Sequence, residues 1–139
     1  MNATVELQGT RLTLRRAKVD EIGLVFATWM SAARQLRGNV RLSVFNRFYP
    51  DIVHRLLETE PVVTLTREGE DTPHAWACGR PENLLHFAYV PFKLRGNGLG
   101  REVVRAVLGD YPSTVWVTAS PLTIPHHARY VYNPYLRPS

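Results

Sequence analysis

The sequence contains a single cysteine, Cys78, and this scarcity excludes several kinds of site. One thiol cannot build an internal disulfide framework or a zinc site made of several thiolates. Its apolar neighbours predict a buried and inert side chain. The adjacent His126 and His127 have no acidic or thiol partner at ligand spacing, so we expect no bound metal.

Long apolar runs are also missing from the chain. It has no stretch of eighteen apolar residues, and it begins without the basic and then apolar pattern of a secretory signal. Repeats, low-complexity tracts and Gly/Ser linkers are absent as well, and a length of 139 residues suits one domain. We therefore expect a cytoplasmic protein without a membrane partner, folded as a single domain over residues 1–139.

Lysine occurs only at Lys18 and Lys93, yet the chain is basic. It has 17 Lys and Arg against 12 Asp and Glu, which gives a net charge of +5. The excess is densest after residue 92, where six basic side chains accompany two acidic ones. Such a charge favours an anionic partner, either nucleic acid or a phosphate-bearing cofactor, and does not decide between them.

Hydrophobic periodicity predicts a mixed α/β (α+β) domain. Apolar residues alternate with polar ones in some segments and recur at three- and four-residue steps in others. Pro50 lies inside one helical stripe, so that helix either begins near this residue or is kinked there. Strands are predicted within 5–16 (a hairpin or one bent strand), 62–66, 74–78, 84–90 and 114–118, and helices within 22–33, 45–57 and 99–108.

The most informative segment joins the strand at 84–90 to the helix at 99–108. Gly96, Gly98 and Gly100 stand there at alternate positions, and glycine is entropically costly unless the backbone requires it. A helix N-terminus presents unpaired N–H groups and partial positive charge, so the segment predicts a bound anion such as phosphate. Arg95 and Arg101 would flank that anion. The alternative is a tight strand-to-helix connection with solvated arginines.

Two common phosphate-binding loops do not fit this spacing. A Walker loop needs lysine and then serine or threonine after its last glycine, whereas Arg101 and Glu102 follow Gly100. A dinucleotide-binding fingerprint needs a glycine at position 101 and more chain to complete a doubly wound sheet. Hydrolase motifs such as Gly-x-Ser-x-Gly and His-Glu-x-x-His are missing as well.

Residues 95–100, Arg-Gly-Asn-Gly-Leu-Gly, resemble the Arg/Gln-x-x-Gly-x-Gly/Ala motif of the GNAT superfamily of acyl-CoA-dependent N-acyltransferases. Val90 stands five residues before the arginine, as in that family, and the order of the elements agrees over residues 3–120. The resemblance implies a mixed, mostly antiparallel central sheet flanked by helices. Most members continue with two more strands, so the ending at Ser139 implies a shortened C-terminus.

The resemblance further implies transfer of an acetyl group from acetyl-CoA to an amine, by direct attack in a ternary complex. The pyrophosphate would lie on the glycine-rich amides, and the pantetheine arm would pair with the strand before them. The acceptor would be a small molecule or a peptide, and a homodimer is compatible with the family. The implied cofactor-binding residues are Tyr89, Val90, Arg95, Gly96, Asn97, Gly98, Leu99, Gly100 and Arg101.

Two catalytic residues are suggested on the same basis. The family carries Ala-x-x-Leu-Tyr on a helix after its fifth strand, and residues 128–132 have this spacing with valine for leucine. Tyr132 is thus the implied acid for the leaving thiolate, with Tyr130 and Tyr135 as competitors. His86 is the candidate base, because histidine titrates near neutrality. Glu82 acting through a water is the alternative, and each of these residues can instead be structural.

Two other functions stay open at this point. One is a catalytically degenerate protein of the same fold that binds nucleic acid or a protein partner. The other is a relative of the Mom-type DNA-modifying proteins, which are short, basic members of this fold that act on nucleobases. That comparison rests only on size and charge. Nucleic acid is therefore a less favoured partner than an amine with acetyl-CoA.

Overall fold

The computed structural model describes residues 2–7, 9–67, 70, 72–81, 84–109, 114–117 and 129–132. Its helices are α1 (Ile22–Gln35), α2 (Leu42–Thr59) and α3 (Leu99–Leu108), with the short 3₁₀ turns η1 (Val19–Glu21) and η2 (Phe92–Leu94). Its strands are β1 (Asn2–Leu7), β2 (Thr10–Arg16), β3 (Val62–Arg67), β4 (Ala75–Arg80), β5 (Leu84–Tyr89), β6 (Thr114–Val117) and β7 (Arg129–Tyr132).

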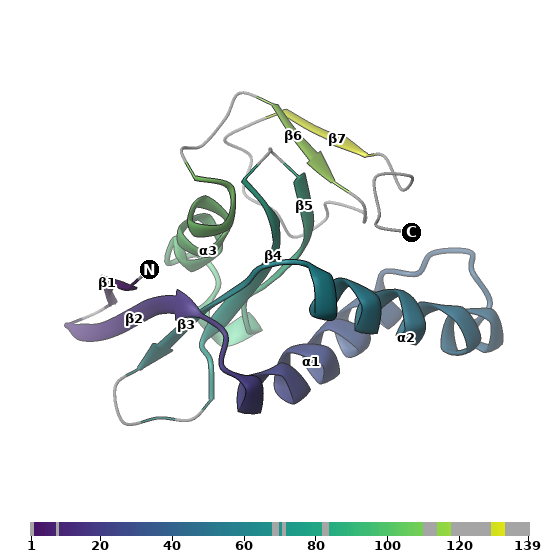
Figure 1. The fold of residues 1–139 in the computed structure, drawn as a ribbon, viewed down its shortest axis with the longest axis horizontal. Helices are drawn as coiled ribbons and strands as arrows, with labels where there is room; N and C mark the ends of the chain where they lie inside the picture. Colours follow the sequence, from purple (N-terminus) through teal and green to yellow (C-terminus); the bar gives the residue numbers. More distant parts are fainter. Residues whose placement is uncertain are drawn as a thin grey trace.

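One seven-stranded sheet carries these strands in sequence order, from β1 to β7 (Figure 1). Neighbouring strands from β1 to β5 are antiparallel, whereas β6 lies parallel to β5 and β7 parallel to β6. The predicted mixed, mostly antiparallel sheet flanked by helices is therefore confirmed. The first two strands form a hairpin, and Gly9 in its turn has a positive φ of 80°.

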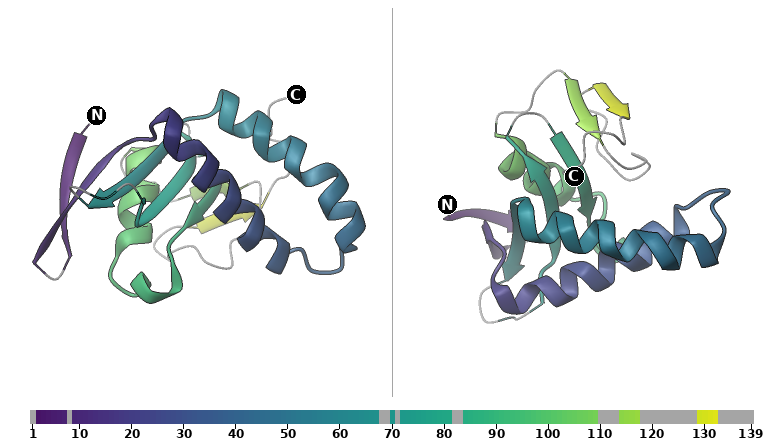
Figure 2. Two further views of the ribbon diagram at one scale, coloured as in Figure 1. Left: turned by 90° about the horizontal axis from the view of Figure 1, so that it is seen from below. Right: turned by 45° about the vertical axis from the view of Figure 1, so that its right-hand side comes forward.

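Helices cover both faces of the sheet, and each face has its own core (Figure 2). Alternate residues of a strand point to opposite faces, so neighbouring strand residues enter different cores. The core beneath α3 includes Leu12, Leu65, Leu85, Val103 and Val104. The core beneath α1 and α2 includes Val25, Trp29, Val53, Trp76 and Phe87.

Helix α2 begins well before Pro50, which lies inside it. A start near Pro50, one of the two predicted options, is therefore wrong. Packing holds the first turns of the helix in place: Phe45 is buried and stacks on Tyr49 with ring centroids 4.9 Å apart. Tyr49 in turn accepts a hydrogen bond from the Trp29 indole of α1 at 3.0 Å. These contacts outweigh the backbone hydrogen bond that a proline cannot donate.

A β-bulge interrupts the pairing of β4 with β5. Cys78 pairs with Phe87 but Gly79 pairs with Leu85, so His86 is an extra residue on β5. Because of this insertion, Leu85 and Phe87 enter opposite cores although they are two residues apart. A bulge of this kind changes the direction of the side chain at the extra residue, which is His86 here.

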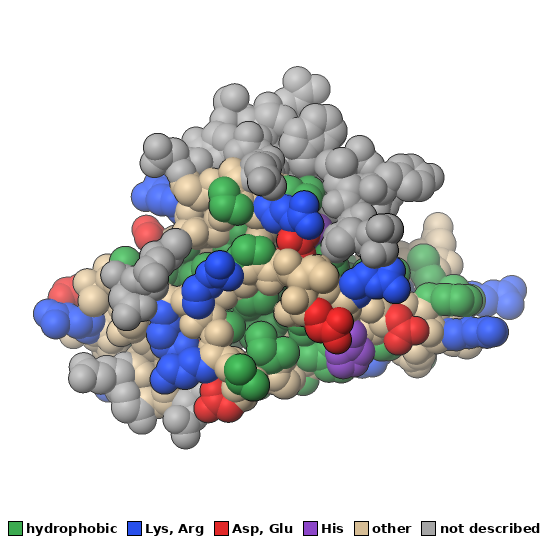
Figure 3. Space-filling view, viewed as in Figure 1, with side chains coloured by type: hydrophobic (Ala, Val, Ile, Leu, Met, Phe, Trp, Pro, Cys, Tyr) green, Lys and Arg blue, Asp and Glu red, His purple; other side chains and the backbone are tan. Residues whose placement is uncertain are grey.

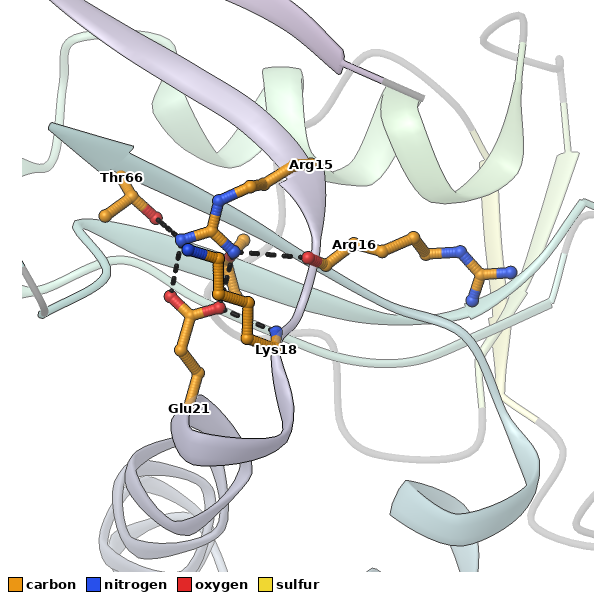
Figure 4. Close-up of polar contacts among 6 residues, drawn as sticks. Arg15, Arg16, Lys18, Glu21 and Thr66 are labelled. Atoms are coloured by element: carbon orange, nitrogen blue, oxygen red, sulfur yellow. Dashed lines mark hydrogen bonds and ion pairs between the residues drawn. The ribbon is translucent and has the colours of Figure 1, made fainter. Parts of the chain in front are cut away.

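A buried ion pair fastens the start of α1 to the sheet (Figure 4). Arg15 of β2 donates to both carboxylate oxygens of Glu21, at 2.6 and 3.0 Å, and also to Thr66 Oγ1 at 3.3 Å. The backbone N–H of Lys18 donates to the same carboxylate at 2.8 Å. Burial tends to raise the pKa of Glu21, but these hydrogen bonds and the nearby positive charges outweigh it. The pKa of Glu21 therefore lies below its usual value.

This ion pair predicts a pH dependence of stability. A carboxylate with a lowered pKa stabilises the fold above its unfolded pKa, and the contribution is lost as the pH falls through its folded pKa. We expect the free energy of unfolding to decrease below the usual value of 4.5, and Glu21→Gln to flatten that decrease. Urea unfolding of the wild type and of Glu21→Gln at several pH values between neutral and about pH 3 measures the decrease and its flattening. Glu6→Gln on the exposed side of β1 is the control, and equal slopes for all three proteins would contradict the prediction.

Residues Arg129–Tyr132 form a strand, so the helix implied for residues 128–132 is wrong there. The sequence Arg-Tyr-Val-Tyr combines β-branched and aromatic side chains, which favour extended backbone. The strand pairs in parallel with β6, with Tyr132 opposite Val117. Val117 in turn lies opposite Leu85 of β5, so these three backbone positions follow one line across the sheet.

Candidate functional site

The connection from β5 to α3 contains two glycines in the left-handed region. Gly96 and Gly98 have φ values of +87° and +78°, which L side chains rarely adopt. Gly98 is the N-cap of α3, and its carbonyl accepts the backbone N–H of Glu102 at 3.2 Å. The backbone conformation thus requires glycine at both positions, in agreement with the sequence pattern.

Hydrogen bonds hold this connection against the end of β5. Arg95 Nε donates to the carbonyl oxygen of Val90 at 2.9 Å, and Asn97 Nδ2 donates to that of Leu94 at 3.1 Å. The N–H of Leu94 donates to the Pro91 carbonyl at 2.9 Å and closes η2. The side chains of Arg95 and Asn97 therefore shape the loop, in addition to any contact with an anion.

The space over the two glycines is open. A Cβ built on Gly96 or Gly98 would meet no atom within 4 Å, so packing against the rest of the protein is not what requires them. The first N–H groups of a helix have no intrahelical acceptor, which applies here to Leu99, Gly100 and Arg101. We call residues 95–101 the glycine cradle. It can accept an anion on its backbone donors and on the positive end of α3.

Helix α3 is a firm support for this cradle. Its apolar stripe lies against the sheet, and the exposed Arg101 and Arg105 face solvent. A helix pinned by several fully buried side chains keeps its N-terminus at a fixed position relative to the strand that precedes it. The buried residues of the stripe are Leu99, Val103, Val104, Val107 and Leu108.

An aromatic cluster lies beneath the end of β5, on the face covered by α1 and α2. Tyr89 stacks on Trp76 with centroids 6.2 Å apart, and Trp76 also lies close to Trp29 and Phe87. The Trp76 indole donates to Thr28 Oγ1 at 2.8 Å. The cluster fixes the strand end from which the cradle departs. The contact between Trp76 and Tyr89 joins paired positions of β4 and β5, which local sequence pattern does not reveal.

His86 and Glu60 form a buried polar pair, and Arg80, whose side chain is 40% exposed, joins Glu60 from the surface. Glu60 Oε1 lies 2.8 Å from His86 Nε2, and Glu60 Oε2 accepts Arg80 Nε at 2.5 Å. Glu60 and His86 are only 6% and 2% exposed. The candidate base is therefore held by a carboxylate that is itself paired with a guanidinium. Sequence reasoning missed Glu60 and Arg80. Glu60 lies 26 residues before His86 in the chain, and Arg80 lies on the neighbouring strand β4.

The other catalytic candidates are Glu82, Tyr130, Tyr132 and Tyr135. Glu82 and Tyr135 lie outside the described residues. Tyr130 and Tyr132 are described in backbone only, within β7. The role of Tyr132 as the acid therefore stays a prediction. Its backbone lies in a strand and not in the helix that the family resemblance implied.

Two further expectations concern Cys78 and metals. Cys78 is buried as predicted, and burial together with the charge of Glu60 raises the pKa of its thiol, which leaves it unreactive. Within the described part of the chain, no group of three or more His, Cys, Asp or Glu could hold a metal ion. No helix among those residues has the length and apolar character needed to cross a membrane.

Comparison with known proteins informs the fold. No protein-family model and no curated protein sequence matches the chain. Among solved structures, the chain is similar to the apo form of YjaB from Escherichia coli, determined in solution, with a TM-score of 0.53. The two share 19% sequence identity over 68% of this chain and 63% of YjaB. The match thus spans less than two thirds of YjaB and supports the fold alone.

Proposed function

We propose that the chain is an N-acetyltransferase that moves the acetyl group of acetyl-CoA to an amine. The observation that carries this proposal is the open glycine cradle between β5 and the N-terminus of α3. Backbone N–H groups that meet the positive end of a helix are suited to phosphate. The cradle matches the motif of the GNAT superfamily in its place between a buried strand and a helix.

The donors present fit the pyrophosphate of coenzyme A. Gly96 and Gly98 leave room for phosphate oxygens to approach the backbone, where a Cβ would project into open space. Lys93, Arg95 and Arg101 are exposed around the cradle and offset the negative charge. Arg101 lies in the first turn of α3, where the helix dipole disfavours a cation unless an anion is bound.

The direction of β5 gives the pantetheine arm a path from the cradle toward His86. His86 lies four residues before Val90, which is about 13 Å along a strand. An extended pantetheine arm covers such a span. Acetyl-CoA bound in this way would supply an activated thioester near His86.

The chain's own residues would then handle the protons. His86 would take a proton from the acceptor's ammonium group, directly or through a water, so that the neutral amine can attack the thioester carbonyl, form the C–N bond and displace the thiolate. Glu60, 2.8 Å from Nε2, would stabilise the imidazolium that forms. Tyr132 stays our candidate for donating a proton to the leaving sulfur. The backbone of Tyr132 is paired through Val117 with that of Leu85, which precedes His86 in β5. Two strand spacings separate Tyr132 from Leu85, about 10 Å, so the two candidates lie at the same height along the strands.

Thermal unfolding with acetyl-CoA tests the cofactor site. A ligand that binds only the native state stabilises it by about 2.7 kcal/mol at about a hundred times its Kd. We expect this shift in the wild type and its loss in Gly98→Val, which strains the backbone and fills the cradle. Gly38→Val is the matched control, because Gly38 also has a positive φ and open space but lies between α1 and α2. It should keep the ligand-induced shift.

The appearance of free coenzyme A thiol with a panel of amines then measures catalysis. We expect turnover to require Arg95, since Arg95→Ala removes a cation and the hydrogen bond to Val90. Absence of any shift at millimolar acetyl-CoA would contradict the proposal. In that case, nucleic-acid binding that weakens steeply with salt would favour the degenerate or Mom-like alternative.

A further inference from the structure

The outer side of α2 exposes apolar side chains. Five large hydrophobic residues are exposed in the described part of the chain, and four of them lie within residues 40–48. Val44 is 44% and Phe48 is 56% exposed. The end of the α1–α2 pair that carries them projects beyond the sheet (Figure 1). Figure 3 shows hydrophobic and arginine side chains gathered there, at the right-hand end of the view.

Val44 and Phe48 belong to a regular stripe along the whole helix. Six positions recur at alternating steps of three and four residues, which places them on one side of an α-helix. All six are exposed, and the stripe is distinct from the buried one that contains Phe45, Val53 and Leu56. We call it the α2 stripe; its members are Arg41, Val44, Phe48, Asp51, Arg55 and Glu58.

The charges at the two ends of the α2 stripe run against the helix dipole. Arg41 is the N-cap, the first turn has no acidic residue, and the last turn contains Glu58 but no basic residue. Cations are unfavourable at a helix N-terminus and anions at its C-terminus. Arg41 and Glu58 are seventeen residues apart, about 25 Å along the helix, so they cannot compensate each other within one chain.

We infer that the α2 stripe is a homodimer interface in which two copies of α2 pack antiparallel across a two-fold axis. An axis between Tyr49 and Pro50 brings Arg41 opposite Glu58 of the partner subunit, because both lie equally far from it. The same register places Val44 opposite Arg55 of the partner subunit and Phe48 opposite Asp51 of the partner subunit, with the two Phe48 rings on either side of the axis. Each misplaced charge then meets its opposite, and the interface is self-complementary as two-fold symmetry requires.

The composition of the stripe favours a second copy over other partners. It holds two arginines and two carboxylates, so its charged groups sum to zero. Nucleic acid or an anionic membrane would be repelled by Asp51 and Glu58, whereas an antiparallel copy offers Glu58 a cation, Arg41 of the partner subunit. Arg47 also lies over the Phe48 ring, 5.3 Å from its centroid, and so flanks the apolar centre with a cation. The inference does not depend on acetyl transfer.

Sedimentation velocity of the full chain, from micromolar to near-millimolar concentration, tests the interface. We expect the wild type to approach twice the mass of one chain, and Phe48→Ser to remain monomeric. Arg41→Glu and Glu58→Arg should each weaken association about tenfold, because each brings like charges together at both ends of the seam. The double variant Arg41→Glu with Glu58→Arg should restore association, since the swap recreates both ion pairs.

Circular dichroism verifies that these surface variants stay folded. A dimer that survives Phe48→Ser and both charge reversals would lie elsewhere and overturn the inference. A wild type that stays monomeric throughout would overturn it as well. If that monomer instead co-sediments with phosphatidylglycerol vesicles or single-stranded DNA, the exposed end of α2 has an anionic partner rather than a second copy.

Discussion

Replacing Gly79 by alanine is expected to destabilise the protein by about 3 kcal/mol or more. A Cβ at this position would overlap the carbonyl oxygen of Leu84 and come within 3.0 Å of Val107 Cγ1 and 3.1 Å of the Leu85 Cα. Two of these three neighbours are backbone atoms of β5, so a side-chain rotation cannot relieve the overlap. The strands would have to separate at the bulge, and α3 would have to shift away from the sheet.

Urea unfolding monitored by tryptophan fluorescence measures this loss. Gly23→Ala is the matched control, because a Cβ there meets nothing within 4 Å and the residue lies in α1. It should stabilise the protein by about 0.5 to 1 kcal/mol through helix propensity and reduced freedom of the unfolded chain. Similar stability of Gly79→Ala and wild type would mean that β4 and β5 are not held as closely as the bulge requires.

Local pattern was sufficient for most of the fold. The strand and helix segments over residues 62–108 were predicted within a few residues of their bounds, because periodicity and glycine or proline breaks act over short distances. The bulge at His86 was not predictable in this way. Leu85 and Phe87 are both apolar and both buried, so nothing in the sequence marks the change of face between them.

The same distinction between local and distant information applies to the site. The need for glycine before α3 was predictable because positive φ angles and a helix N-terminus are properties of consecutive residues; anion binding there stays a prediction. The place of Glu60 was not predictable, since its partners Arg80 and His86 lie 20 and 26 residues away. The helix implied near Tyr132 failed for another reason: it came from the family pattern, against the β propensity of residues 129–132.

Glu60→Ala is the second substitution with a large expected effect. Glu60 is the carboxylate shared by His86 and Arg80, and both contacts are lost at once. Removing the buried carboxylate leaves the buried His86 without its partner, whereas the Arg80 side chain, 40% exposed, is hydrated; we expect a cost of about 3 kcal/mol. The loss falls at the bulge, so β5 and the end of α2 should loosen together, with faster amide exchange around His86.

Glu60→Gln separates charge from packing in this cluster. The amide has nearly the shape of the carboxylate and can still accept one hydrogen bond, so the expected loss is about 1 to 3 kcal/mol, less than for alanine. Glu70→Ala is the surface control. Its carboxylate, 42% exposed, contacts Arg67 and His74 near the surface, and its removal should change stability by less than about 1 kcal/mol. If Glu60→Ala is no more destabilising than Glu70→Ala, the cluster is structurally dispensable. Should Glu60→Gln instead keep most of the stability but lower the turnover of acetyl-CoA and shift its pH profile, Glu60 acts through His86, as the proposed mechanism requires.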